Sequence, residues 1–215
     1  MRTVSGPLSA QALAFASPAE VSQRRSSARG SRIVSVESSF TGTLSLQPVG
    51  RVTATTSTAT VATGAAQCYS FTLPAGVSFA RWQLFNAHTQ GGVLTDLDLD
   101  VYATGNCTGT AIGTSAARGS DEIVTREGPT AGVYSAEVTG YATPAGGALY
   151  TLSAWIVGGS GGPTTLVASG PSSVYAGGAS SVALSWNVRI GARYMGAVNF
   201  LDGASTLLKL LVDNR

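Results

Sequence analysis

Hydrophobic residues alternate with polar ones in many short segments of this chain, and this period of two constrains the fold more than any other feature. In residues 96–102, Leu97, Leu99 and Val101 alternate with three aspartates. Successive side chains of a β-strand point to opposite faces of a sheet, so such a segment buries one side and leaves the other in water. An amphipathic helix would repeat its apolar residues with a longer period. The pattern therefore predicts an all-β chain.

The spacing of these segments predicts the architecture. They recur at intervals of about 8–12 residues and are separated by turn signals such as Pro74-Ala75-Gly76. Such spacing is typical of β-sandwiches and jelly rolls, and we predict one such domain over residues 33–157. A Gly-rich linker follows at residues 158–163, and candidate strands in residues 164–215 predict a small fibronectin- or Ig-like β domain. Residues 1–32 are predicted to be a linker or the truncated tail of a preceding domain.

Composition and charge argue against two classes of partner. Charged residues make up only 11% of the 215 residues, and 13 basic and 11 acidic side chains give a net charge of +2. That charge is too small for the strong positive field of a nucleic-acid-binding protein. No apolar run approaches the roughly 20 residues that a membrane span needs. We therefore predict no nucleic-acid partner and no membrane partner.

Cys68 and Cys107 are the two cysteines of the chain. An even number of cysteines in a sequence rich in Ser, Thr and Gly suits an oxidising compartment. We therefore predict a disulfide between them and a secreted, extracellular protein. Two buried free thiols are the alternative. A metal site at this pair is disfavoured, because His88 is the only histidine that could add a ligand.

Asp96, Asp98 and Asp100 are predicted to share one face of a strand, with neighbours about 7 Å apart. Carboxylates so placed repel one another unless water, hydrogen bonds or a cation compensates. Calcium takes oxygen ligands, so a Ca²⁺ site is one interpretation. The run lacks the glycine and the distal glutamate of an EF-hand loop. A solvated outer face is therefore the favoured interpretation, and no cofactor is required.

The aromatic residues include candidates for a binding surface. Trp82 and Trp186 alternate in step with neighbouring apolar residues and are predicted to lie in the core. Trp155 lies on the polar side of its segment. Together with Tyr141 and Tyr102, it is the best candidate for a platform that binds carbohydrate or collagen. Packing of Trp155 against the neighbouring small domain is the favoured alternative.

Four blocks of the sequence resemble, in the same order, strands of the bacterial pre-peptidase C-terminal type domain found behind secreted subtilisin-like serine proteases. Within them, Asp100 departs from the family pattern, since an aromatic residue is usual there. After the Gly-rich linker, Ser185-Trp186 and residues 191–198 resemble the fibronectin-like tail of the same proteases. The four blocks are Ala75–Asn86, Asp96–Tyr102, Ala131–Tyr141 and Tyr150–Trp155.

This resemblance implies a non-catalytic accessory segment of a secreted subtilisin-like serine endopeptidase, which stabilises the protease or tethers it to protein substrate. Its partners would be the catalytic domain in the same parent chain and extracellular protein or polysaccharide. Residues 8–32 are similar to the linker before this module, so Met1 is expected to be internal to a longer protein. Ala14-Phe15-Ala16 imitates a signal-peptide cleavage site, but polar residues interrupt the apolar segment before it. An independent carbohydrate- or collagen-binding module is the alternative function.

Residues 113–117 resemble the motif around the nucleophile of subtilisin-like proteases, which would make Ser115 the nucleophile. Catalysis would also need a base and a carboxylate that orients it. His88 is the only available base, and it lies in a polar turn without the glycine-flanked context of the family's catalytic histidine. The sequence continues after Ser115 as a loop, where the family has a buried helix. We therefore expect no catalytic activity from this fragment and interpret Ser115 as a loop serine.

Overall fold

The computed structural model describes residues 15–16, 20–23, 29–158, 166–187, 192–203 and 205–214. In these ranges the regular structure is β-strand, apart from two single-turn 3-10 helices, η1 (Asn86–His88) and η2 (Gly92–Leu94). The prediction of an all-β chain is confirmed. Among the described residues, no helix has the length and hydrophobicity needed to cross a membrane.

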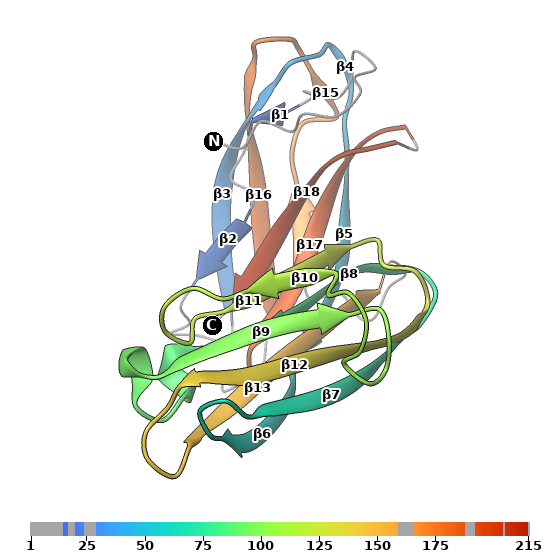
Figure 1. Cartoon of the computed structure of the whole chain (residues 1–215). Coiled ribbons are helices and arrows are strands. Elements are labelled where there is room, and N and C mark those ends of the chain that lie inside the picture. Colours follow the sequence, from blue (N-terminus) through green and yellow to red (C-terminus); the bar gives the residue numbers. More distant parts are fainter. Residues whose placement is uncertain are drawn as a thin grey trace. The chain divides into compact units, whose positions relative to one another are not determined.

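The chain forms two compact units, which are labelled by their strands in Figure 1. The continuous unit spans Ala54–Gly158. The split unit combines the residues up to Thr53 with those from Gly159 onward, so its two parts come from both ends of the chain.

The continuous unit is an eight-stranded jelly roll. Its sheets have the strand orders β6-β13-β8-β11 and β7-β12-β9-β10, and all paired strands are antiparallel. Each strand is followed by one in the other sheet, except that β9 leads directly to its neighbour β10. This arrangement of two four-stranded sheets is the jelly roll that the sequence predicted. The strands are β6 (Thr55–Val61), β7 (Ala66–Leu73), β8 (Val77–Gln83), β9 (Asp96–Tyr102), β10 (Gly113–Ser115), β11 (Ile123–Glu127), β12 (Gly132–Ala142) and β13 (Ala148–Gly158).

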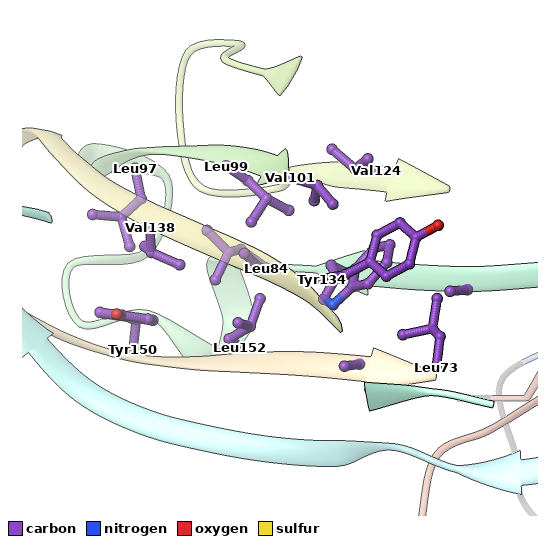
Figure 2. Packing of buried hydrophobic residues seen from close by; sticks show 14 of the residues in the cluster. Leu73, Leu84, Leu97, Leu99, Val101, Val124, Tyr134, Val138, Tyr150 and Leu152 are labelled. Atoms are coloured by element: carbon purple, nitrogen blue, oxygen red, sulfur yellow. The ribbon is translucent and has the colours of Figure 1, made fainter. Parts of the chain in front are cut away.

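The core of the continuous unit lies between its two sheets (Figure 2). Leu97, Leu99 and Val101 of β9 are buried in it, and the three aspartates between them are partly exposed, as the alternation predicted. Trp82 of β8 is also in this core. Its ring lies 5.9 Å from that of Phe71, edge to face, and 6.3 Å from that of Tyr134, stacked. The prediction that Trp82 is a core residue is confirmed.

The split unit also has two four-stranded sheets, with the orders β1-β3-β16-β14 and β2-β18-β17-β5, and a two-stranded sheet of β4 and β15. Val34 and Val36 pack with Val182, Leu184 and Trp186 in its core, so Trp186 is a core residue as predicted. The strands are β1 (Phe15–Ala16), β2 (Glu20–Gln23), β3 (Arg29–Ser38), β4 (Gly42–Thr43), β5 (Ser45–Thr53), β14 (Leu166–Ser169), β15 (Ser173–Val174), β16 (Ala179–Asn187), β17 (Tyr194–Asp202) and β18 (Ser205–Asn214).

The predicted domain boundaries are corrected in two respects. Residues 1–32 were predicted to be a linker or a truncated tail, but those that the structure describes form β1, β2 and the start of β3 in the split unit. The sequence assigned residues 33–53 to the first β-sandwich, but these residues form strands of the split unit. There β3 pairs with β16 over nine positions, from Arg29 opposite Asn187 to Glu37 opposite Ala179, and β5 pairs with β17. The strands of residues 166–214 need these partners, because a short segment alone cannot enclose a core. Most of residues 1–32 and of the predicted Gly-rich linker lie outside the described residues.

Candidate functional site

The outer face of the sheet β7-β12-β9-β10 carries the acidic residues that the sequence singled out. Asp96, Asp98 and Asp100 occupy alternate positions of β9 and are partly exposed. The structure adds Glu137 of β12, which lies directly opposite Asp100, while Thr139 lies opposite Asp98. Like charges directly opposite one another in a sheet repel, so this face requires compensation.

Hydrogen bonds provide part of that compensation. The Oδ1 atom of Asp96 accepts a bond from the backbone N–H of Gly119 at 3.1 Å. The Thr114 hydroxyl donates to Asp100. The Tyr102 hydroxyl donates to Oε1 of Glu137 at 3.3 Å. These donors come from β9, β10 and the segment that follows β10, so the fold itself stabilises the outer carboxylates.

The remaining electrostatic repulsion acts on Asp98, the central aspartate. Burial raises the pKa of Asp98 above the ordinary carboxyl value, and the charges of Asp96 and Asp100 raise it further. Burial likewise raises the pKa of Tyr102, with the negative charges of Glu137 and Asp100 acting in the same direction. A bound cation would relieve the repulsion. Within the described ranges, however, no group of three or more His, Cys, Asp or Glu side chains is arranged to hold a metal ion. The Ca²⁺ site stays the alternative interpretation of this face, and the solvated outer face stays the favoured one.

Ser115 lies at the end of β10 rather than in a loop, which corrects the sequence interpretation. Its hydroxyl donates to Oε2 of Glu122 and accepts the backbone N–H of Ile123 at 3.1 Å. The other carboxylate oxygen, Oε1 of Glu122, accepts the N–H of Ala117 at 2.9 Å. The Ser115 hydroxyl therefore closes the connection between β10 and β11 by donating to a carboxylate and accepting from the backbone.

Glu122 is a buried carboxyl group that sequence reasoning missed; its side chain and backbone are only 1% exposed. Burial raises its pKa, the hydrogen bonds from Ser115 and Ala117 lower it, and the charges of Asp98 and Asp96 raise it again. Its position before the apolar Ile123-Val124 pair gave no signal of burial, because a glutamate ahead of a strand is ordinarily exposed.

His88, the other residue considered for catalysis, lies in η1 and is exposed. Its ring packs edge to face against Phe85, with 5.4 Å between ring centroids. The adjoining Asn86 side chain binds the segment before β11: its Oδ1 accepts the N–H of Ser120 at 2.8 Å and its Nδ2 donates to Asp121 at 2.7 Å. The contacts around His88 therefore belong to packing and to the anchoring of η1.

The three aromatic residues predicted for a binding surface are not brought together. Trp155 of β13 is 0% exposed, so the interpretation of Trp155 as a surface aromatic is wrong. Its register partner Arg81 is buried as well. Tyr141 is 68% exposed. Tyr102 pairs with Ser135 of β12, which is six residues from Tyr141 and thus about 20 Å away along the strand.

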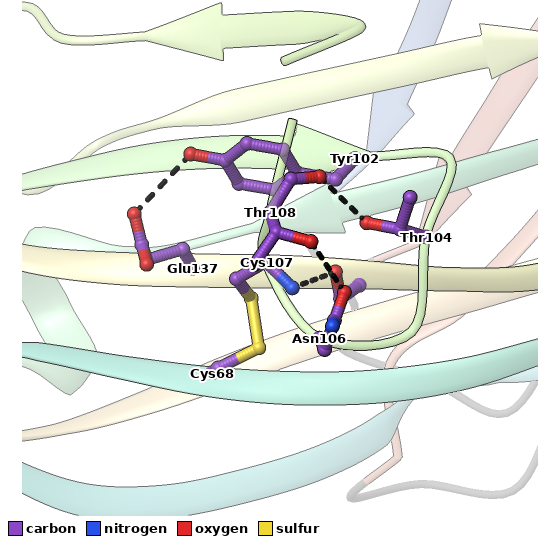
Figure 3. The surroundings of a disulfide bond; sticks show 8 residues. Cys68, Tyr102, Thr104, Asn106, Cys107, Thr108 and Glu137 are labelled. Atoms are coloured by element: carbon purple, nitrogen blue, oxygen red, sulfur yellow. Dashed lines mark hydrogen bonds between the residues drawn. A yellow bond between two sulfur atoms is a disulfide. The ribbon is translucent and has the colours of Figure 1, made fainter. Parts of the chain in front are cut away.

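The predicted disulfide between Cys68 and Cys107 is confirmed, with 39 residues of sequence separation (Figure 3). It links β7, an edge strand, to the segment between β9 and β10. Cys107 adopts a left-handed backbone conformation with φ of 53°, and its N–H donates to the Ser135 hydroxyl at 2.9 Å. Within the same segment, the Thr104 hydroxyl donates to the carbonyl of Thr108. The segment is therefore held to the outer face of the sheet both covalently and by hydrogen bonds.

Comparisons with known proteins add little to this geometry. No protein-family model matches the chain, and no curated protein is similar to it in sequence. Among solved structures, it is similar to PliG of Aeromonas hydrophila, a periplasmic lysozyme inhibitor of g-type lysozyme. The identity is 15%, the match covers 64% of this chain and 96% of that chain, and the TM-score is 0.30. A TM-score this low transfers no binding property to the present chain.

Proposed function

We propose that this chain is a non-catalytic accessory segment of a secreted subtilisin-like serine endopeptidase. One observation carries the proposal: the four sequence blocks that resemble the accessory domain coincide with β8, β9, β12 and β13. These are the two inner strands of each sheet of the jelly roll. The resemblance therefore covers the residues that specify the scaffold, which supports membership of the same type of module.

The disulfide supports the proposed secretion. Structural disulfides form and persist in oxidising compartments, which include the extracellular space and the periplasm. The bond ties an edge strand to a long connection, and it therefore has a structural use in a protein that works outside the reducing cytosol.

The physical role of such a segment is to stabilise the catalytic domain or to hold the enzyme near its protein substrate. Tethering raises the local concentration of substrate around the active site without adding chemistry. The hydrogen bonds of Ser115 support the non-catalytic part of the proposal, because they engage its hydroxyl in the connection between β10 and β11.

Two experiments test the proposal. The reading frame upstream of Met1 is expected to continue into a catalytic domain with Asp, His and Ser motifs; a stop codon directly upstream would contradict membership of a protease. The purified chain, incubated with casein, is expected to release peptides no faster than its Ser115→Ala variant. Hydrolysis that a serine-directed inhibitor blocks and Ser115→Ala abolishes would contradict the non-catalytic role.

A further inference from the structure

The outer edge of β6 is open along its length. β6 is the last strand of the sheet β6-β13-β8-β11, and within the described parts of the chain no strand pairs with its outer side (Figure 1). Such an edge turns unpaired backbone N–H and C=O groups outward, and these groups form a template for another extended strand. The ligand that fits this edge is therefore a β-strand.

β6 lacks the features that ordinarily prevent edge-to-edge pairing, which are charges, prolines and bulges. Its seven residues are Thr, Thr, Ser, Thr, Ala, Thr and Val, and no charged residue occurs anywhere between Arg51 and Arg81. Its register with β13 is continuous from Val61 to Thr55.

Other edge strands of the described structure do carry such protection. β5 contains Pro48 and Arg51, and its register with β17 is interrupted by a bulge. β11 contains Arg126 and Glu127. β7, an edge of the other sheet, also lacks charges, prolines and a bulge, but its Cys68 carries the disulfide to the segment between β9 and β10. β6 is an unprotected edge that carries no such cross-link.

The sequence of β6 is suited to pairing with a second copy of itself. Thr56, Thr58 and Thr60 are exposed on the outer face, whereas Ser57 and Ala59 are half-buried on the inner face. An antiparallel pair with a two-fold axis at Thr58 places Thr56 opposite Thr60 and Ser57 opposite Ala59. Exposed threonines then meet exposed threonines, and small inner side chains meet each other.

The other side of the strand already shows this kind of pair. Thr58 lies opposite Thr151 of β13, and their hydroxyl oxygens are 3.1 Å apart in a hydrogen bond. Threonine pairs directly across an antiparallel ladder contribute favourably to sheet stability. The same chemistry is available on the open side.

We propose that two copies of this chain associate through their β6 strands, which joins the two four-stranded sheets into one continuous sheet across a two-fold axis. Such an interface is isologous, so every contact away from the two-fold axis occurs twice. A seven-residue strand buries less than the roughly 1,000 Å² of a stable interface, and the association is therefore weak and reversible.

Sedimentation equilibrium of the full chain between about 5 and 500 µM, the range suited to a small interface, tests the proposal. The weight-average mass is expected to rise with concentration from 21.7 kDa toward twice that value. Thr58→Lys places two like charges opposite each other at the two-fold axis, about 5 Å apart between Cβ atoms, and is expected to keep the mass at that of the monomer.

Two double variants test the register. Thr56→Lys with Thr60→Lys sets like charges opposite each other and is expected to abolish association. Thr56→Lys with Thr60→Glu sets opposite charges opposite each other and is expected to retain it. Ser181→Lys with Ser185→Lys, on an exposed face of the central strand β16, is the control for added charge and should associate like the wild type.

Circular dichroism must show that each variant is folded. A wild-type chain that remains at 21.7 kDa over the whole range would overturn the proposal. So would equal association of the two double variants, because a β6 pair centred on Thr58 requires them to differ. A monomeric chain whose β6 amide signals shift only on addition of an extended peptide would also overturn it and would identify a peptide as the occupant.

Discussion

Replacing Cys68 and Cys107 by serine tests how much the disulfide contributes to the continuous unit. The bond closes a loop of 39 residues of sequence separation. In the chain-entropy model, removing a cross-link of that length lowers the free energy of unfolding by about 4 kcal/mol. Each kcal/mol moves the Tm of a domain of roughly 100 residues by about 4 °C, so the Tm of the continuous unit is expected to fall by roughly 15 °C.

Differential scanning calorimetry measures this change, and wild-type protein reduced with a phosphine should reproduce the Tm of the double-serine variant. Ser135→Ala is the matched control, because it removes only the hydrogen bond from the N–H of Cys107 and is expected to cost about 1 kcal/mol. A loss below about 1 kcal/mol for the double-serine variant would refute the reasoning, since the hydrogen bonds of the segment would then hold it without the cross-link.

Four further predictions concern the acidic face, the core and the exposed aromatic. Because burial raises the pKa of Glu122, the contribution of this group to the free energy of unfolding should be largest below the ordinary carboxyl value of 4.5 and should be lost as the pH rises through the raised folded-state pKa. Glu122→Gln should remove that contribution to the pH dependence in urea titrations between pH 4 and 8, and an unchanged pH dependence would contradict the assignment. Melting with Ca²⁺ and with EDTA should give the same Tm, since Asp96 and Asp100 already accept hydrogen bonds, whereas a higher Tm with Ca²⁺ would establish a site bound only by the native state. Leu99→Ala should lower the free energy of unfolding by about 2–5 kcal/mol because Leu99 is fully buried. A decrease below about 1 kcal/mol in chemical denaturation would contradict this prediction. Neither the wild type nor Tyr141→Ala should be retained on insoluble collagen or cellulose, because Tyr141 has no aromatic neighbour from the predicted set; retention of the wild type that Tyr141→Ala abolishes would support a binding module instead.

The sequence alone determined most of the strands after residue 32 and, in a strand such as β9, the side that is buried. In β9 the leucines and Val101 are buried and the aspartates partly exposed, as their alternation predicted. In the same way, the candidate strands predicted in residues 164–215 correspond to β14, β16, β17 and β18. These predictions succeed because the pleat of a strand is a local property, and the order of residues along the strand expresses it directly.

Only the tertiary structure decided which strands pair and which side chains meet. Residues 33–53 have the same local pattern as the jelly roll that follows, and pairing with β16 and β17 places them in the other unit. The register of β12 places Glu137 opposite Asp100, and Trp155 is fully buried although it lies on the polar side of its segment. These outcomes depend on contacts between residues far apart in the chain, and a period of two carries no information about the partner of a strand.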